Sequence, residues 1–210
     1  MAWRTFLLLW LLAAARGASG QLLDSIGLFL QEPPRFIARI DARGGFISNR
    51  SVRFIGVKAG LEHGRRFQYG LGYSLLYPEE GRQVEVEGRM ESGTLRMGYA
   101  APYAEYAFFR RGAWEARIPL QVGFGRGSLS IHDAQGRRRT VVRTGLILYE
   151  PSMTIQYRFL RYFAASAGWG FRLVAQTRAD LGERLSAPVY HIGLRVFLGD
   201  LWRDARGGPE

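Results

Sequence analysis

From Pro34 onward, large apolar side chains alternate with small or polar ones, and this period of two residues is the strongest constraint on the fold. Successive side chains of a β-strand point to opposite faces, so the alternation predicts strands. In residues 67–77, Phe, Tyr and Leu hold the odd positions, while Gln, Gly and Ser hold most of the even ones. We predict eight strands, near residues 35–44, 51–62, 66–77, 94–109, 113–126, 141–158, 162–176 and 187–199.

The connections between these strands alternate in length. The short ones are residues 63–65, 110–112 and 159–161. Between them lie long ones at 78–93, 127–140 and 177–186, and the first connection, at 45–50, is of modest length. Outer-membrane barrels have an even number of antiparallel strands, short periplasmic turns and longer outside loops. The alternation matches a chain that starts in the periplasm.

The volume of the two strand faces indicates which of them points inward. The interior of an eight-stranded barrel is just wide enough for side chains, so a whole face of Trp, Tyr, Phe and Leu would overfill it. The face with Gly, Ser and a few long polar side chains would fit. The bulky face must then meet lipid, and we predict an all-β, eight-stranded antiparallel up-and-down transmembrane β-barrel.

With this orientation, most charged strand residues fall inside the barrel. We predict an interior network of six cations, five anions and one histidine, formed by Arg39, Asp41, Lys58, Glu62, Glu105, Glu115, Arg117, Glu150, Arg158, Arg172, His191 and Arg195. Charges that face lipid at mid-depth cost a few kcal/mol each, which explains their exclusion from the other face. The near balance of sign favours a solid, ion-paired interior, and an ion or solute path is the alternative.

Four arginines depart from this pattern, because they have the outward parity at the loop-side ends of their strands. They are Arg53, Arg96, Arg126 and Arg143. Guanidinium groups bind phosphates in a bidentate way, so these residues are candidate contacts to lipopolysaccharide. The alternative is that the strands end earlier and these arginines lie in loops.

The first twenty residues have the form of a signal peptide. Arg4 precedes an apolar run that is too short to span a bilayer, and small residues end the segment at Gly20. We predict cleavage before Gln21, with an uncleaved anchor as the alternative. The expected organisation is a signal peptide at 1–20, a partly helical periplasmic lead-in at 21–33, the barrel at 34–199 and a flexible periplasmic tail at 200–210.

Composition excludes several classes of site. The chain has no cysteine, which removes disulfides, Cys–zinc sites and thiol nucleophiles. The net charge is +11, but no basic helix or nucleic-acid signature accompanies it, so we do not expect nucleic-acid binding. No phosphate-cradling glycine loop, metal-ligand spacing or dinucleotide fingerprint occurs, and we predict neither a cofactor nor a metal.

The paired turns, the order of loop lengths and the segments 67–73 and 167–171 resemble the OmpA/OmpX-like family of small outer-membrane β-barrels. The resemblance covers about residues 34–199, and residues 190–198 are similar to a barrel-closing assembly signal. It implies that the barrel-assembly machinery is a partner. Many members of this family end on an aromatic residue, whereas here the chain continues from Gly199 to Glu210.

The leading functional hypothesis is a non-enzymatic protein of the bacterial outer membrane with a structural or surface-interaction role. Its expected partners are outer-membrane lipid and lipopolysaccharide, and a monomer is favoured. A lipid-modifying acyl hydrolase or acyltransferase near His132, which follows Ser128 and Ser130 and precedes Asp133, is one alternative. A narrow solute pore is another, and a soluble ligand-binding barrel is the architectural rival.

Overall fold

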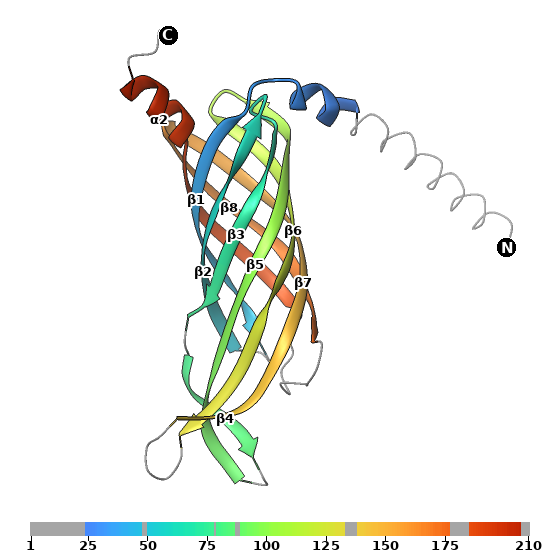
Figure 1. Cartoon of the computed structure of the whole chain (residues 1–210), viewed down its shortest axis with the longest axis vertical. Helices are drawn as coiled ribbons and strands as arrows, with labels where there is room; N and C mark the ends of the chain where they lie inside the picture. The colour runs from blue at the N-terminus through green and yellow to red at the C-terminus, as the bar shows by residue number, and fades with distance from the viewer. Residues whose placement is uncertain are drawn as a thin grey trace, which may run out of the picture.

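The computed structural model describes residues 24–47, 50–77, 79–86, 89–132, 138–176 and 185–206, and it confirms the predicted barrel (Figure 1). Eight strands of the described chain close into one antiparallel ring, and a ninth, β4, extends it on one side. The strands are β1 Arg35–Ile47, β2 Arg50–His63, β3 Phe67–Leu76, β4 Glu79–Val86, β5 Arg89–Arg111, β6 Trp114–His132, β7 Arg138–Leu160, β8 Phe163–Gln176 and β9 Ala187–Val196.

Each strand of the ring pairs with its neighbour in the sequence, which is the up-and-down order. The pairing of β3 with β5 and of β1 with β9 closes the ring. The short strand β4 pairs with the outer part of β5, and this hairpin projects beyond the ring at the lower end of Figure 1.

The strands are strongly staggered around the ring. Starting at Arg35 on β1 and stepping from each residue to its register partner on the next strand, one returns to β1 at Gly45. The return point is ten residues farther along β1, and this shift is the stagger of the barrel. The residues on the way are Glu62, Gln68, Glu105, Pro119, Ser152, Gly170 and Val189. Strand number and stagger together set the tilt and the diameter of a barrel. This ring has an interior that side chains can fill.

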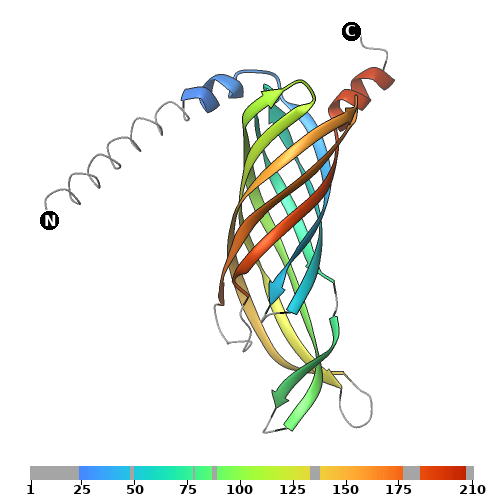
Figure 2. The same ribbon diagram turned by 180° about the vertical axis from the view of Figure 1, so that it is seen from behind.

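Both described ends of the chain lie at one end of the barrel, together with the short turns (Figures 1 and 2). These turns are at residues 64–66, 112–113 and 161–162. Gly64 and Gly112 have φ values of 57° and 58°, a backbone conformation that favours glycine and lets the strands reverse tightly. The strand ends that the long connections join lie at the other end, which agrees with the predicted order of turns and loops.

Four strands extend farther toward this outer end than the sequence predicts. Strand β1 ends at Ile47 where residue 44 was expected, β5 begins at Arg89 where 94 was expected, β6 ends at His132 where 126 was expected, and β7 begins at Arg138 where 141 was expected. In the extensions of β5, β6 and β7 polar residues are frequent at both odd and even positions, so the alternation that marks a half-buried strand is missing there.

Two short helices lie at the turn end of the barrel. One covers residues 24–30, within the predicted lead-in, and the other is α2, Leu198–Ala205. The last strand ends at Val196, earlier than residue 199, and most of the segment predicted as a flexible tail is helical. Neither of these described helices is long and apolar enough to cross a membrane. The predicted signal peptide, residues 1–20, lies outside the described residues.

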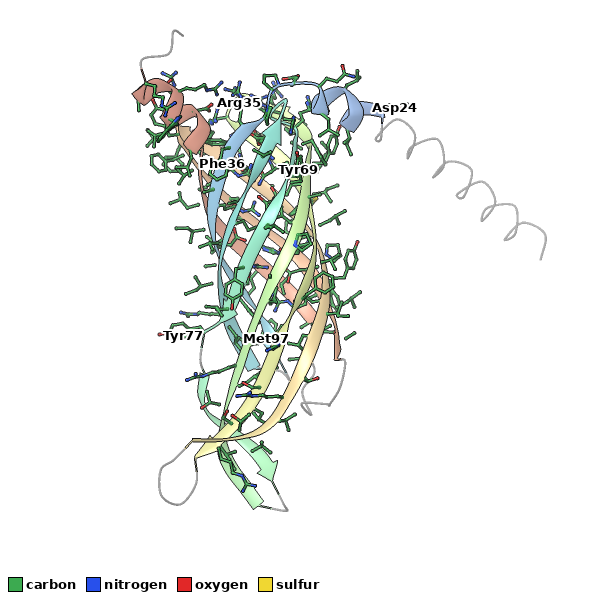
Figure 3. The ribbon with its side chains drawn as sticks, viewed as in Figure 1. Asp24, Arg35, Phe36, Tyr69, Tyr77 and Met97 are labelled. Carbon is green, nitrogen blue, oxygen red and sulfur yellow. The ribbon has the colours of Figure 1, made fainter. Side chains whose placement is uncertain are left out.

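Large apolar side chains point away from the barrel wall all around the ring. Leu71 is 68% exposed, Ile192 64% and Trp169 59%, fractions that are unusual for such residues in a protein surrounded by water. Figure 3 shows the side chains of Phe36 and Tyr77 projecting from the wall in the same way. The orientation of the two strand faces is therefore the one that the volume argument predicts.

Candidate functional site

The half of the interior nearest the turns contains a group of charged side chains around Arg117. Its guanidinium donates to the Glu62 carboxylate at 2.7 Å and to Glu115 at 2.6 Å. Gln156 donates a further hydrogen bond to Glu115 at 3.1 Å. Arg195, on β9, lies 3.4 Å from the same oxygen of Glu62. These contacts join β2, β6, β7 and β9 across the lumen.

Glu105 and Asp41 continue these contacts along the interior. One oxygen of Glu105 forms an ion pair with the Arg39 guanidinium at 2.5 Å, and the other accepts a hydrogen bond from Arg195 at 2.7 Å. Arg39 Nε also forms an ion pair with Asp41 Oδ1 at 2.7 Å. The ammonium group of Lys58 lies 3.5 Å from Asp41, so this carboxylate has cations on two sides.

A third group of interior contacts surrounds Glu150. Its carboxylate accepts hydrogen bonds from Arg43 at 3.0 Å, from Arg172 at 2.7 Å and from the amide of Gln121 at 2.9 Å. His191 Nε2 lies 3.9 Å from the same carboxylate. Arg43 also approaches Asp41 at 3.9 Å, which links Glu150 to the rest of the network.

Acidic and basic side chains therefore alternate without a break through the interior. The order is Glu115, Arg117, Glu62, Arg195, Glu105, Arg39, Asp41, Arg43, Glu150 and Arg172. All are buried, with 8% exposure or less. Buried charges need partners, because removal from water costs several kcal/mol per ion. Each carboxylate here contacts at least two cationic or amide donors.

An apolar cluster closes the interior toward the loop end. Its buried members come from six strands and one connection: Ile47, Val52, Phe54, Leu76, Leu95, Met97, Tyr99, Ala101, Leu129, Leu146, Leu148 and Leu185. The guanidinium of Arg172 lies over the Phe54 ring, 4.1 Å from its centroid. The Tyr99 hydroxyl accepts from Arg43 at 3.0 Å. The two aromatic rings thus form the boundary between the charged and the apolar layer.

Glycines opposite the large side chains make this packing possible. A Cβ at position 123 would lie 2.6 Å from Leu148 Cγ and 2.8 Å from the ring of Tyr99. These distances are too short for a real contact, so glycine is needed where these side chains pack against the β6 backbone.

The structure places most of the predicted interior residues in this network, with one exception and one addition. Arg158 lies at the turn-side mouth, partly exposed, and pairs with Asp200 of α2 at 3.5 Å. Arg43, which the sequence-based list omits, occupies a central position and is only 1% exposed. It shares the parity of Arg39 and Asp41 on the same strand, and that signal could have identified it.

The inward apolar cluster was also missed. Phe54, Leu146 and Leu148 have the inward parity, next to lipid-facing residues of similar character. Where both faces of a strand are apolar, alternation carries no information about which side chain points inward.

The four outward arginines are all exposed on the outer face of the barrel. Arg96 on β5 and Arg143 on β7 are both register partners of Ser128, and Arg126 lies two residues from Ser128 on the same face of β6. The structure therefore brings three of them together, while Arg53 lies apart on β2.

His132 is the last residue of β6, and its register partner is Arg138. Its side chain and Asp133 lie outside the described residues, so the predicted catalytic alternative stays a prediction.

Comparison with known proteins gives no match by sequence: no family model matches the chain, and no curated protein does either. Solved structures do match. Neisserial surface protein A has a TM-score of 0.54 at 12% identity, covering 77% of this chain and 96% of its own. The attachment invasion locus protein Ail of Yersinia pestis, solved in complex with the heparin analogue sucrose octasulfate, has a TM-score of 0.52 at 11% identity, covering 79% and 99%. The resemblance to small outer-membrane barrels is thus confirmed at the level of the fold.

Proposed function

We propose that this protein is a non-enzymatic barrel of the bacterial outer membrane that acts through its outer surface, in a structural or surface-interaction role. The observation that carries the proposal is the filled interior. A continuous charge network occupies the turn-side half, and an apolar cluster occupies the loop-side half. In the part of the barrel that the structure describes, these side chains occupy the space that a solute path or an internal substrate site would need.

The size of one interior cavity supports this view. A cavity bordered by Arg39, Asp41, Lys58 and His191 has a volume of about 20 Å³. That is room for about one water molecule. Opening a path for a hydrated ion would require the Glu105 and Asp41 ion pairs to separate, which leaves charges unpaired in the interior.

The outward apolar face supports the location in a membrane. On β6 it runs from Trp114 to Phe124, and on β3 from Tyr69 to Leu75, with Tyr77 just after the strand. A tilted strand of this length covers an apolar band about 25 Å tall, which is the height that outer-membrane barrels present to lipid. A polar, charged exterior would be expected of a soluble ligand-binding barrel.

The test combines location with conductance. We expect the full chain, expressed in a Gram-negative host, to be recovered in the outer-membrane fraction and to migrate differently on a gel before and after heating. Reconstituted in a planar bilayer, the barrel should be electrically silent. Recovery in the soluble periplasm would overturn the location, and regular single-channel steps would overturn the closed interior.

As its partner we propose lipopolysaccharide, held at the outer leaflet by Arg96, Arg126 and Arg143, with Arg53 as a separate contact. Each lies just beyond the outward apolar run of its strand: Arg126 follows Phe124, for example, at the next outward position. Phosphate groups of lipid at this level would be within reach of three neighbouring guanidinium groups.

A further inference from the structure

The helix α2 is attached to the barrel by its acidic side. Asp200 pairs with Arg35 at 3.6 Å and with Arg158 at 3.5 Å, so its carboxylate joins β1 and β7. One turn later, Asp204 pairs with Arg161 at 3.0 Å and accepts a hydrogen bond from the Tyr162 hydroxyl at 2.5 Å. Charged contacts to the barrel rim therefore hold the helix.

The apolar side of α2 faces away from the protein. Its members follow the spacing of one helical face, at positions i, i+3, i+4 and i+7, and are Leu198, Leu201, Trp202 and Ala205. No residue of the helix is buried, and Leu201 and Trp202 are 42% and 61% exposed. In a soluble protein an amphipathic helix packs its apolar face on the core. In α2 the charged face contacts the protein and the apolar face points away from it.

This apolar face lies next to the lipid-facing surface of the barrel. Gly199 packs on the backbone of Phe36, where a Cβ would come within 2.9 Å of the Phe36 nitrogen. Phe36 itself is 47% exposed and points outward at the end of β1 (Figure 3). Leu160, next to the turn that holds Asp204, is 56% exposed. The helix thus extends the lipid-facing surface at the turn-side rim.

A cation borders the apolar face: the Arg206 guanidinium lies over the Trp202 ring, 4.4 Å from its centroid. Arg203 lies on the opposite, polar side of the helix, where it pairs with Asp200 at 2.5 Å. Helices that lie in a membrane interface combine a Trp- and Leu-containing face with cations at its border, where the cations meet anionic headgroups.

We infer that α2 is an interfacial helix: Leu198, Leu201, Trp202 and Ala205 enter the periplasmic leaflet of the outer membrane at the headgroup boundary, beside β1. The partner of this surface is a phospholipid leaflet. The inference rests on the proposed membrane location, and it adds a second contact with lipid that does not involve a strand.

The absence of cysteine in the chain allows a direct test. Single variants Leu201→Cys and Ala205→Cys carry a nitroxide label on the apolar face, and Arg203→Cys carries one on the polar side as the matched control. Ile192→Cys places a label in the lipid-facing wall of the barrel. Each labelled full-length barrel is reconstituted in phosphatidylethanolamine–phosphatidylglycerol vesicles, and its folding is checked by heat-modifiable migration.

The measurement is the collision rate of each label with oxygen, which concentrates in lipid, and with a water-soluble nickel chelate. We expect labels at 201, 205 and 192 to prefer oxygen and the label at 203 to prefer the chelate. If 201 and 205 behave like 203 while 192 prefers oxygen, the helix does not lie in lipid and the inference is wrong, although the membrane location stands. If 192 also prefers the chelate, the proposed location fails and the inference fails with it.

Discussion

Glu105 shows how closely single residues of the interior depend on one another. Its two oxygens bind arginines from the first and the last strand, and it is 1% exposed. We expect Glu105→Gln to lower the free energy of unfolding by about 3 kcal/mol, because two buried guanidinium groups lose their shared anion. Urea unfolding of the barrel, reconstituted in vesicles, measures the change.

The matched control is Glu32→Gln, which makes the same chemical change at an exposed position before β1. The contact of Glu32 to His63 uses its backbone carbonyl, which the substitution keeps. We expect a change within about 0.5 kcal/mol there, as for most surface substitutions. Equal unfolding free energies for the two variants would show that the Glu105 ion pairs do not stabilise the barrel.

The charges of the interior could mostly be predicted from the sequence, whereas their partners could not. Parity alone assigns Asp41 and Glu150 to the inner face, because each has the opposite parity to large apolar neighbours. Their link through Arg43 depends on strands β1 and β7, which are not adjacent in the ring. Which side chains meet across the lumen depends on the stagger and tilt of the strands in the closed ring. No local pattern in the sequence predicts either quantity.

At the scale of elements, the strands are predicted well where one face meets lipid and the other a polar interior. For β3 and β8 the predicted ends lie within a residue of the observed ones. The predicted ends are wrong for the outer parts of β5, β6 and β7. Apolar and polar residues alternate along a strand only where its two faces meet different environments, here lipid and a polar interior. Beyond the membrane this difference between the two faces is lost, so the alternation ends although the backbone hydrogen bonds between the strands continue.

The helix α2 was missed although its pattern is present in the sequence. Leu198, Leu201, Trp202 and Ala205 have helical spacing, but the helix is only eight residues long and has no side-chain N-cap. Isolated helices of that length are marginal in water. The ion pairs to Arg35 and Arg161 that hold it in place come from distant parts of the chain.

The contact of Tyr162 with α2 makes the attachment of the helix dependent on pH. The hydrogen bond to the Asp204 carboxylate raises the pKa of Tyr162 above its ordinary value of 10.0. A raised pKa in the folded state means that the contact contributes fully below pH 10.0 and is lost as the pH rises through the raised value. We expect a nitroxide at Ala205→Cys to become more mobile over that alkaline range.

The phenolate absorbance of the protein, compared with that of Tyr162→Phe, gives the titration of Tyr162 itself. In Asp204→Asn the pKa should return toward its ordinary value, since the carboxylate acceptor is gone. An unchanged titration in Asp204→Asn would exclude this hydrogen bond as the cause.

For the molecule as a whole, the outer surface divides into an apolar band and a basic border at the loop side. Replacing Arg53, Arg96, Arg126 and Arg143 with Gln should reduce the lipopolysaccharide retained per purified barrel by at least about tenfold, because one charged hydrogen bond contributes roughly 1.5–3 kcal/mol. The bound lipid is measured by phosphate and sugar analysis after purification in detergent.

A control variant makes the same charge change at the turn side, at Arg111, Arg161, Arg203 and Arg206. It should retain as much lipopolysaccharide as the unmodified barrel. Equal retention by all three proteins would remove lipopolysaccharide as the partner of the four outward arginines.

The seam between β1 and β9 has a consequence for how the barrel is assembled. Arg39, Asp41 and Arg43 lie on the first strand and Arg195 on the last, so the two strands that meet last in synthesis share one charge network. Glu105 on β5 contacts Arg39 and Arg195 across the lumen, and Glu62 on β2 contacts Arg117 and Arg195 in the same way, so these pairs depend on the closed ring. An open sheet therefore carries incompletely neutralised charges on its inner face, which keeps that face in water. We therefore expect closure of the ring and neutralisation of its inner face to occur together during assembly.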